Sequence, residues 1–315
     1  MEMSKSNPSE TYRSLRDTVS EINNILFCSP EKPKYEVAHY TSLHTLKDLS
    51  KSKNRFRLYN ADYMNDPEEG QVFFKIMNEY RINIEKFYKY EARSYRSPAY
   101  IGSFVHLEEE SAQKDKLFLW RTYGKHDNEE AAGACLIFNN EQCFAKYPTP
   151  QFGSMSNSMQ EEPALYEIHY RGKPNEKLEK VLEKLAGQLR DMDGFIETVD
   201  AEEIKNVLRR SVCKLLDSIR FLFKEKHYSE ENEARVIQWR YGETNESLVS
   251  QIEVDVENIP PHFYLEAPES VRFSEVILGP KTKNIREWKQ WLKVKAREQG
   301  ESIDIKQSEI KYGKS

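Results

Sequence analysis

The chain has 315 residues, enough for one large domain or two small ones. Hydrophobic residues make up 38% and charged residues 31%, a balance typical of a globular protein with a well-charged surface. The formal net charge of -5 argues against a protein whose main task is to coat a nucleic-acid backbone.

No apolar stretch approaches the ~20 residues that a helix needs to cross a bilayer, so no membrane partner is expected. Residues 1–10 are polar and lack the apolar segment of a signal peptide, and we interpret them as a disordered leader. Such a leader fits a cytoplasmic protein, or one that is secreted without a cleaved signal. The four cysteines are scattered without a C-x-x-C pair, which fits a reducing compartment.

Hydrophobic periodicity predicts the secondary structure in chain order. Helices are expected over residues 11–26, 42–49, 67–77, 116–124, 178–189 and 204–222, and after Asn284. Strands are expected over residues 35–40, 56–59, 100–105, 134–138, 166–170, 234–239 and 275–278. A helical turn is expected over 141–146. Residues 148–163 are rich in Pro, Ser, Gln, Met and Asn, which indicates a mobile loop.

Strands and helices alternate irregularly and without an internal repeat, so we predict an α+β fold. The apolar stripes of 178–189 and 204–222 predict a helical hairpin, with Asp200 as the N-cap of its second helix. We expect a single domain over residues 11–315 that carries this hairpin as an insertion at about 174–226.

Common catalytic signatures are absent, including the phosphate-binding G-x-x-x-x-G-K-[ST] and the zinc-protease H-E-x-x-H. The seven histidines and four cysteines do not fall at metal-ligand spacing, so no metal is expected. Cys135 lies within an apolar strand, where core packing explains it better than nucleophilic catalysis does.

Four segments carry polar side chains that folding alone does not explain. In the first, strand alternation puts Val37, His39 and Thr41 on one face, at the point where the strand enters a loop. The second runs from Tyr59, Asn60 and Tyr63 into Asn65-Asp66-Pro67-Glu68-Glu69. Each also has an ordinary structural interpretation: a histidine packed at the end of a strand, and a turn that caps the next helix.

The third segment is Trp120-Arg121-Thr122-Tyr123-Gly124. Trp120 and Tyr123 share a helix face, which is typical of core packing, whereas Arg121 points elsewhere and suits a phosphate or carboxylate. In the fourth, Glu231, Glu233 and Arg235 alternate onto one face where a strand begins. Both a strand-edge ion pair and a carboxylate held in a pocket by the arginine fit that pattern.

In order and spacing, these segments resemble a widespread bacterial family known only as a domain of unknown function. The motifs that carry the resemblance are His39-Tyr40-Thr41, Asn65-Asp66-Pro67-Glu68-Glu69, Ser103-Phe104, Trp120 to Gly124, Gly133 to Phe138, Tyr228 to Arg235 and Ile277-Leu278-Gly279-Pro280. They cover roughly residues 35 to 298. The layout also resembles that of ADP-ribosyltransferases, and a bacterial effector group that ADP-ribosylates a threonine of host ubiquitin is similar in length.

The resemblance to ADP-ribosyltransferases implies a mixed-sheet core of that type and NAD+ as substrate. It implies a catalytic carboxylate, for which Glu233 is the first candidate, Glu231 the second and Asp66 the third. The resemblance assigns adenosine to His39 and Thr41, and the pyrophosphate to Arg121 or Arg235. It assigns stacking on nicotinamide to Tyr59 or Tyr63, and the nicotinamide amide to Asn60 and Asn65. Tyr40 and Tyr123 are also expected to bind the cofactor. No Ser-Thr-Ser strand is present and Glu230 adjoins the acidic pair, so the choice of acid stays open.

We therefore expect an NAD-dependent mono-ADP-ribosyltransferase that acts on a protein acceptor, with host ubiquitin as a candidate and nucleic acid less favoured. A carboxylate near the ribose would stabilise the oxocarbenium-like transition state of glycosidic bond cleavage. Two alternatives stay open. One is a non-catalytic sensor that binds a nucleotide or a protein, and the other is a nuclease with Asp66, Glu68 and Glu233 around magnesium.

Overall fold

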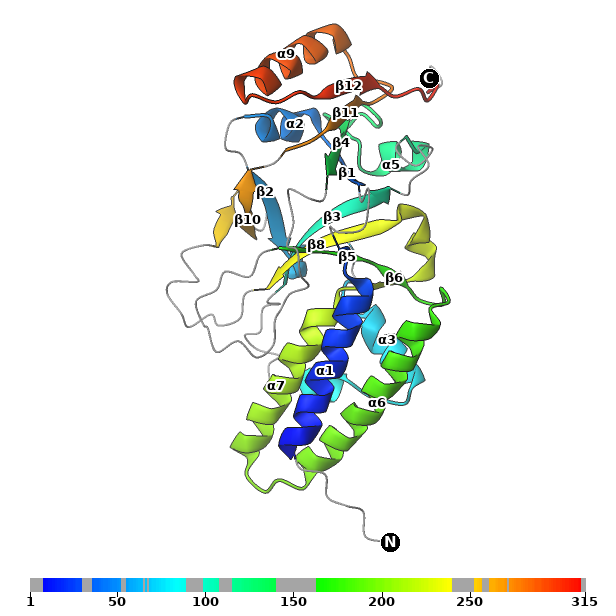
Figure 1. The fold of residues 1–315 in the computed structure, drawn as a ribbon, viewed down its shortest axis with the longest axis vertical. Helices are drawn as coiled ribbons and strands as arrows, with labels where there is room; N and C mark the ends of the chain where they lie inside the picture. The colour runs from blue at the N-terminus through cyan, green and yellow to red at the C-terminus, as the bar shows by residue number, and fades with distance from the viewer. Residues whose placement is uncertain are drawn as a thin grey trace.

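A mixed β-sheet occupies the middle of the molecule, with helices packed beyond both of its ends (Figure 1). The computed structural model describes residues 8–29, 36–51, 55–64, 66, 68–88, 99–107, 115–139, 163–239, 252–256, 261–270 and 272–312. Among these residues, none of the helices is both long and apolar enough to span a bilayer.

The helices gather in two groups. The α-helices are α1 (Pro8–Leu26), α2 (Leu43–Leu49), α3 (Val72–Glu79), α4 (Glu85–Tyr88), α5 (Leu117–Thr122), α6 (Glu176–Glu197), α7 (Glu202–Arg220) and α9 (Ile285–Glu298), with short 3-10 turns η1 (Ala61–Tyr63) and η4 (Lys226–Glu231). The long helices α1, α6 and α7 form one group at the lower end in Figure 1, and α2 and α9 lie at the upper end.

The strands are β1 (Glu36–Thr41), β2 (Arg55–Asn60), β3 (Ala99–Leu107), β4 (Ala134–Asn139), β5 (Ala164–Glu167), β6 (His169–Tyr170), β7 (Phe223–Lys224), β8 (Glu233–Trp239), β9 (Glu253–Asp255), β10 (His262–Ser270), β11 (Glu275–Leu278) and β12 (Asp304–Gln307). Eight of the described strands follow the order β12-β11-β4-β1-β3-β2-β10-β9, while β8 pairs with β3 and β5. The pairs are antiparallel except β11 with β12 and the separate pair of β6 with β7. The predicted α+β class with a mixed sheet is therefore confirmed.

The predicted helical pair is present as α6 and α7, which pack on α1 through one continuous apolar core. Leu182, Leu185 and Leu216 are fully buried in that core, because each lies on the apolar stripe of an amphipathic helix. In sequence, α6 and α7 lie between β5 and β8. These two strands nevertheless pair with each other in the sheet, so the helices form an excursion from it.

Several boundaries differ from the prediction. Helix α1 begins at Pro8 rather than at Thr11, and the proline suits a first helical position, where no N–H is needed. Ala201, not Asp200, is the N-cap of α7, and it makes no side-chain capping bond. By contrast, the helix expected over residues 42–49 is present as α2, and the Ser42 side chain caps it by accepting from the Thr45 N–H at 3.1 Å.

The expected strand 166–170 is divided between β5 and β6, because the chain turns from β8 to pair with β7. Strands β9, β10 and β12 were not predicted; β12, for example, buries only Ile305 at the sheet edge, so it lacks an alternating pattern. The expected helical turn 141–146, residues 1–7 and most of 148–163 lie outside the described residues.

The sheet opens at β3, and this opening positions the site. On one edge of β3, residues 100–101 lie beside β2 and residues 105–107 beside β1, while β8 runs along the other edge. Strands β1 and β2 thus diverge at Gly102 to Phe104. A Cβ at Gly102 would lie 2.8 Å from Leu58 Cδ2 and 3.2 Å from Phe56 Cε1, so side chains of β2 lean across this gap.

Candidate functional site

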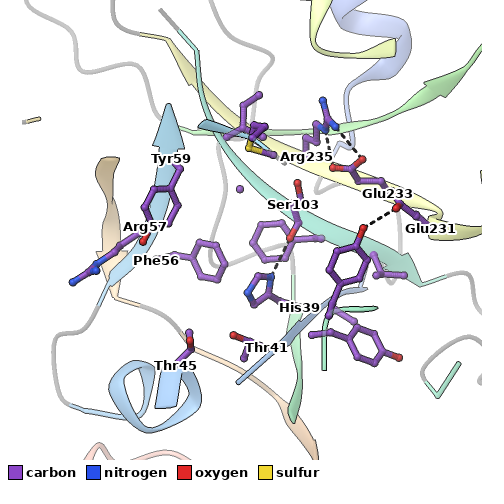
Figure 2. A pocket seen from close by; sticks show the side chains of 18 of the residues that line it. His39, Thr41, Thr45, Phe56, Arg57, Tyr59, Ser103, Glu231, Glu233 and Arg235 are labelled. Carbon is purple, nitrogen blue, oxygen red and sulfur yellow. Dashed lines mark hydrogen bonds and ion pairs between the residues drawn. The ribbon is translucent and has the colours of Figure 1, made fainter. Parts of the chain in front are cut away.

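A cavity of about 840 Å³ lies at the divergence of β1 and β2. His39 from β1, Tyr59 from β2 and Glu233 from β8 all line it, together with Ser103 of β3. Figure 2 shows Arg57 and Tyr59 on one side of His39, and Glu231, Glu233 and Arg235 on the other. The volume lies within the range of roughly 300–1,000 Å³ that is usual for small-molecule sites.

Buried charges of alternating sign form one end of the cavity. Arg235, whose side chain is fully buried, donates from Nη2 to Glu69 Oε2 at 2.8 Å and from Nε to Glu233 Oε1 at 2.7 Å. Lys224 Nζ lies 2.8 Å from Glu233 Oε2 and 2.7 Å from Glu231 Oε2. Three carboxylates against two cations leave this charge cluster one net negative charge.

Glu233 and Lys224 stay ionised because their charged neighbours outweigh the effect of burial on each pKa. Burial alone would raise the pKa of Glu233, but the adjacent Arg235 and Lys224 outweigh that effect and lower the pKa to about 2. Burial opposes the charge on Lys224, yet Glu233 and Glu231 raise the pKa of its ammonium group. A buried charge without such partners would be strongly unfavourable.

Asn232 places both glutamates against the same lysine. It has left-handed backbone angles (φ 45°, ψ 51°) between η4 and β8, a conformation that Asn tolerates better than most residues. Its side-chain Nδ2 donates to the His106 carbonyl at 2.8 Å, and the His106 N–H donates to the Asn232 carbonyl at 2.7 Å. The Glu233 N–H donates to the Tyr170 hydroxyl at 2.8 Å. The chain entering β8 is therefore held on both sides.

Tyr123 extends the charge cluster toward solvent. Its hydroxyl donates to Glu231 Oε1 at 2.7 Å, and the residue is 43% exposed. Burial of the phenol and its hydrogen bond to Glu231 raise the pKa of Tyr123 well above its usual value. The phenol is therefore protonated at neutral pH and acts as a hydrogen-bond donor to the carboxylate.

His39 lies between the two ends of the cavity and is neutral. Its Nδ1 is 3.0 Å from the Ser103 carbonyl, at the point where β3 has neither β1 nor β2 as a backbone partner. Burial lowers the pKa of His39, although the Ser103 carbonyl partly opposes that shift. Since the carbonyl can only accept, Nδ1 carries the proton and Nε2 is left as an acceptor.

Aromatic and basic side chains form the other end of the cavity. The Phe56 ring lies 4.8 Å from the His39 ring in a T-shaped arrangement. The Tyr59 hydroxyl donates to Asp255 Oδ2 at 2.8 Å, and the Arg57 guanidinium lies 4.5 Å from the centre of the Tyr264 ring. Arg55 and Arg57 are exposed lining residues. Arg57 also lies 3.5 Å from Asp255 Oδ2, and Glu266, its partner on β10, lines the cavity too, so this end carries charges of both signs.

Most of the residues predicted for the site line this cavity, namely His39, Tyr40, Thr41, Tyr59, Asp66, Tyr123, Glu231, Glu233 and Arg235. Strand pairing brings them together: β1 and β2 share an edge of β3, and β8 supplies its other edge. Asp66 accepts the Glu68 N–H through Oδ1 at 2.9 Å, which is the turn-capping role that the sequence also allowed.

Three of the predicted residues do not line the cavity. Asn60 is buried, where its Oδ1 accepts from the Asp62 N–H and caps η1. Tyr63 stacks on His262, with ring centres 4.5 Å apart. Arg121 is exposed and donates to the Tyr312 hydroxyl at 3.1 Å, so it is not positioned for a pyrophosphate in the cavity. Asn65 lies outside the described residues.

Sequence reasoning missed Lys224, Glu69 and Tyr170. Lys224 follows α7 in the short strand β7, a place with no sequence signal for a site. Glu69 stands in the Asn65-to-Glu69 motif, but only the fold shows that it pairs with Arg235. If the Glu69 carboxylate is buried it needs a cationic partner, but the sequence does not identify which residue that is.

The carboxylates named for a nuclease are not gathered into a metal-ligand cluster within the described residues. Glu68 pairs with Lys75 Nζ at 2.7 Å, and Glu233 is held by Arg235 and Lys224. Magnesium is held by oxygen ligands that face the ion. The oxygens of these carboxylates already face cationic side chains, so they are poorly suited to that role.

Residues 119–236 match the model of a family described as a protein of unknown function (DUF2971). The match supports an uncharacterised bacterial domain family. It begins within α5 and ends in β8, so it includes Tyr123 and the whole of the Lys224–Glu231–Glu233–Arg235 group. No curated protein and no solved structure matches the chain.

Proposed function

We propose that the chain is an NAD-dependent mono-ADP-ribosyltransferase with an ADP-ribosyltransferase-like sheet core, and that the cavity at the β1–β2 divergence binds NAD+. The observation that carries the proposal is the shared cavity, which combines a neutral imidazole, several aromatic rings and a net negative charge cluster. NAD+ has a cationic nicotinamide ring at one end of an anionic diphosphate. A cavity with a net negative charge cluster at one end and two exposed arginines at the other suits such a molecule.

The reaction breaks the bond between the nicotinamide nitrogen and ribose C1′, and the electron pair leaves with nicotinamide. Positive charge then develops on the ribose, as in glycoside cleavage. The net negative charge of the Glu69–Arg235–Glu233–Lys224–Glu231 cluster would stabilise it. The acceptor hydroxyl oxygen bonds to C1′, and its proton passes to a carboxylate or to solvent.

Glu233 remains the first candidate for the catalytic carboxylate, with Glu231 second and Asp66 third. Glu233 is bound by both Arg235 and Lys224, whereas Glu231 is bound by Lys224 and the Tyr123 hydroxyl. Both are candidates for orienting an acceptor hydroxyl, since each carboxylate oxygen has two lone pairs. The cationic nicotinamide would lie near Glu233 and Glu231, and Tyr59 at the other end of the cavity would contact the adenosine part of NAD+. His39, between the two ends, would accept from a ribose hydroxyl at Nε2.

The test is release of nicotinamide from labelled NAD+ together with transfer of the label to protein. Purified ubiquitin and a cell lysate serve as acceptors, since ubiquitin is the acceptor that the family resemblance suggests. We expect Glu233→Gln or Glu231→Gln to lower turnover by about 10²- to 10³-fold, the usual contribution of one group that stabilises transition-state charge. Circular dichroism checks that each variant is folded.

Glu225→Gln is the matched control. Glu225 is largely buried and ion-paired with Lys75 and Arg171, but it does not line the cavity. Its replacement is expected to leave turnover unchanged. Full turnover in both Glu231→Gln and Glu233→Gln contradicts the proposed mechanism. Thermal stabilisation by NAD+ or ADP-ribose without nicotinamide release supports the sensor alternative, and nucleic-acid cleavage that a chelator abolishes supports the nuclease.

A further inference from the structure

His44, His126 and Asp127 meet at the surface beyond the cavity, on the other side of α2. His44 Nε2 lies 3.1 Å from Asp127 Oδ1, and His126 Nε2 lies 3.4 Å from Asp127 Oδ2. One ligand atom from each of the three lies within 4.8 Å of the others. His44 and Asp127 are separated by 83 residues in sequence, so spacing along the chain predicted no metal site here.

The backbone fixes two of these side chains next to each other. His126 and Glu129 exchange backbone hydrogen bonds of 3.0 and 2.9 Å around a two-residue turn. Asp127 and Asn128 both have positive φ, 48° and 63°, as the central residues of a type I′ turn do. The turn holds Asp127 beside His126, and α2 brings His44 to the same carboxylate.

Stability does not explain the grouping. The side chains of His44 and Asp127 are 73% and 72% exposed, and exposed ion pairs contribute little to the free energy of folding. His126 Nδ1 is buried and has no hydrogen-bond partner in the described part of the chain. A buried nitrogen without a partner lowers stability, so hydrogen bonding does not explain the position of His126 either.

We propose that His44, His126 and Asp127 bind a divalent transition-metal ion of the zinc type. Two atoms bound to a tetrahedral zinc ion at ~2.1 Å lie roughly 3.4 Å apart. The two His–Asp separations, 3.1 and 3.4 Å to different oxygens of Asp127, are close to that value, and the three ligand atoms all lie within 4.8 Å of one another. Imidazole and carboxylate ligands suit Zn²⁺ and its neighbours, whereas Mg²⁺ prefers oxygen ligands alone. The proposal is independent of the proposed transferase activity.

Three protein ligands leave one coordination position open. His44 and His126 also line a hollow of about 570 Å³, whose other lining residues include Trp288 and Trp291 of α9. The rings of these tryptophans are 5.6 Å apart and T-shaped. Helices α2 and α9 lie together at the upper end of Figure 1, so the hollow lies between them. A bound ion would face this hollow, as catalytic rather than structural zinc ions face open space.

The experiment is titration of the full chain, without any histidine tag, with Zn²⁺ by calorimetry and with Co²⁺ by visible absorption. We expect one tightly held ion per chain, a Co²⁺ spectrum with nitrogen ligands, and no binding of Mg²⁺. His44→Ala, His126→Ala and Asp127→Asn should each weaken binding by about 10- to 100-fold or more, since even groups that only orient metal ligands have effects of this size.

His227→Ala is the matched control, because His227 is an exposed histidine away from the group. It should bind Zn²⁺ as the parent chain does. Asp127→Asn keeps a residue that tolerates positive φ, so its fold is expected to persist. Absence of Zn²⁺ binding by the parent chain, or equal affinity in the three variants and the His227→Ala control, would overturn the proposal.

Discussion

Arg235 and Glu69 form a buried ion pair across 166 residues of sequence, with Arg235 Nη2 donating to Glu69 Oε2 at 2.8 Å. The same guanidinium donates to the Phe221 carbonyl at 2.8 Å and to both oxygens of Glu233. One side chain thus joins the turn before α3, the end of α7 and the start of β8. The acidic end of the cavity depends on this arginine.

Replacement of Arg235 is expected to destabilise the protein strongly. Arg235→Met removes the charge but keeps a long side chain, and it leaves Glu69 and Glu233 buried with one cation fewer. Breaking a buried pair in this way costs about 3–5 kcal/mol of unfolding free energy. Urea denaturation at neutral pH measures the change.

Arg121→Met is the control for that experiment. Arg121 is exposed, and its guanidinium donates to the hydroxyl of Tyr312 instead of to a buried carboxylate. Its midpoint of denaturation should equal that of the parent chain. Equal midpoints for Arg235→Met and Arg121→Met would contradict the role assigned to Arg235.

The stability of the protein should fall in acid through Glu233. Its pKa is about 2 in the folded chain, below the ordinary value of 4.5, because Arg235 and Lys224 outweigh the effect of burial. The stabilisation is complete above the unfolded pKa and is lost as pH falls toward the folded pKa. Linkage predicts a loss of about 2 kcal/mol from this group between pH 6 and pH 3.

The measurement is the unfolding free energy of the parent chain and of Glu233→Gln across that pH range. The glutamine variant does not titrate at this position, so its stability should depend less steeply on pH. Parallel curves for the two chains would show that Glu233 has no lowered pKa.

His39 should be neutral at pH 7 with its proton on Nδ1. Burial lowers the pKa of His39, and the Ser103 carbonyl accepts from Nδ1 at 3.0 Å. As pH falls below about 6.5, the unfolded chain takes up the proton before the folded one, so protonation of His39 destabilises the fold. Long-range proton–nitrogen NMR spectra report the tautomer, with His39→Gln used to assign the signal. An imidazolium pattern at pH 7 would refute this assignment.

Gly133 should not tolerate a methyl group. A Cβ there would lie 2.2 Å from the Thr41 carbonyl oxygen and 2.9 Å from the Gly124 carbonyl carbon, both backbone atoms. The backbone of Thr41 therefore packs directly against Gly133. Because Thr41 ends β1 and lines the cavity, this packing also positions that wall of the cavity. Gly133→Ala is expected to cost about 3 kcal/mol, the upper range for overpacking.

Gly187→Ala provides the comparison for Gly133→Ala. Gly187 lies inside α6, and a Cβ there would meet no atom within 4 Å. Alanine favours a helix interior over glycine, so this variant should gain about 0.5–1 kcal/mol. Urea denaturation of both variants gives the two free energies, and the same sign for both would contradict the packing argument.

Local sequence patterns predicted most of the helices and central strands. Leu178, Val181, Leu182 and Leu185 repeat at helical spacing, and α6 buries all four. The apolar run from Ala134 to Phe138 became a fully buried strand. The edge strands β9 and β12 were missed, because β9 buries no residue and β12 buries only one, which leaves too little alternation to detect.

The candidate site was predictable only in part. The motifs that contain His39, Tyr59 and Glu233 stand out because they place polar groups at strand ends, and all three line one cavity. Lys224 carries no such signal, although it bridges Glu231 and Glu233. Arg121 looked as suitable for an anion as Arg235, and only the fold separates the exposed residue from the buried one.

The sequence by itself determined which segments become helices or strands, since that choice depends on the periodic spacing of apolar side chains within a segment. Only the tertiary structure decided which polar groups meet: Glu69 with Arg235, Lys224 with two glutamates, and His44 with Asp127. The physical reason is that these contacts arise from strand pairing and helix packing between distant segments. The energy of a buried charge depends on partners that no local pattern specifies.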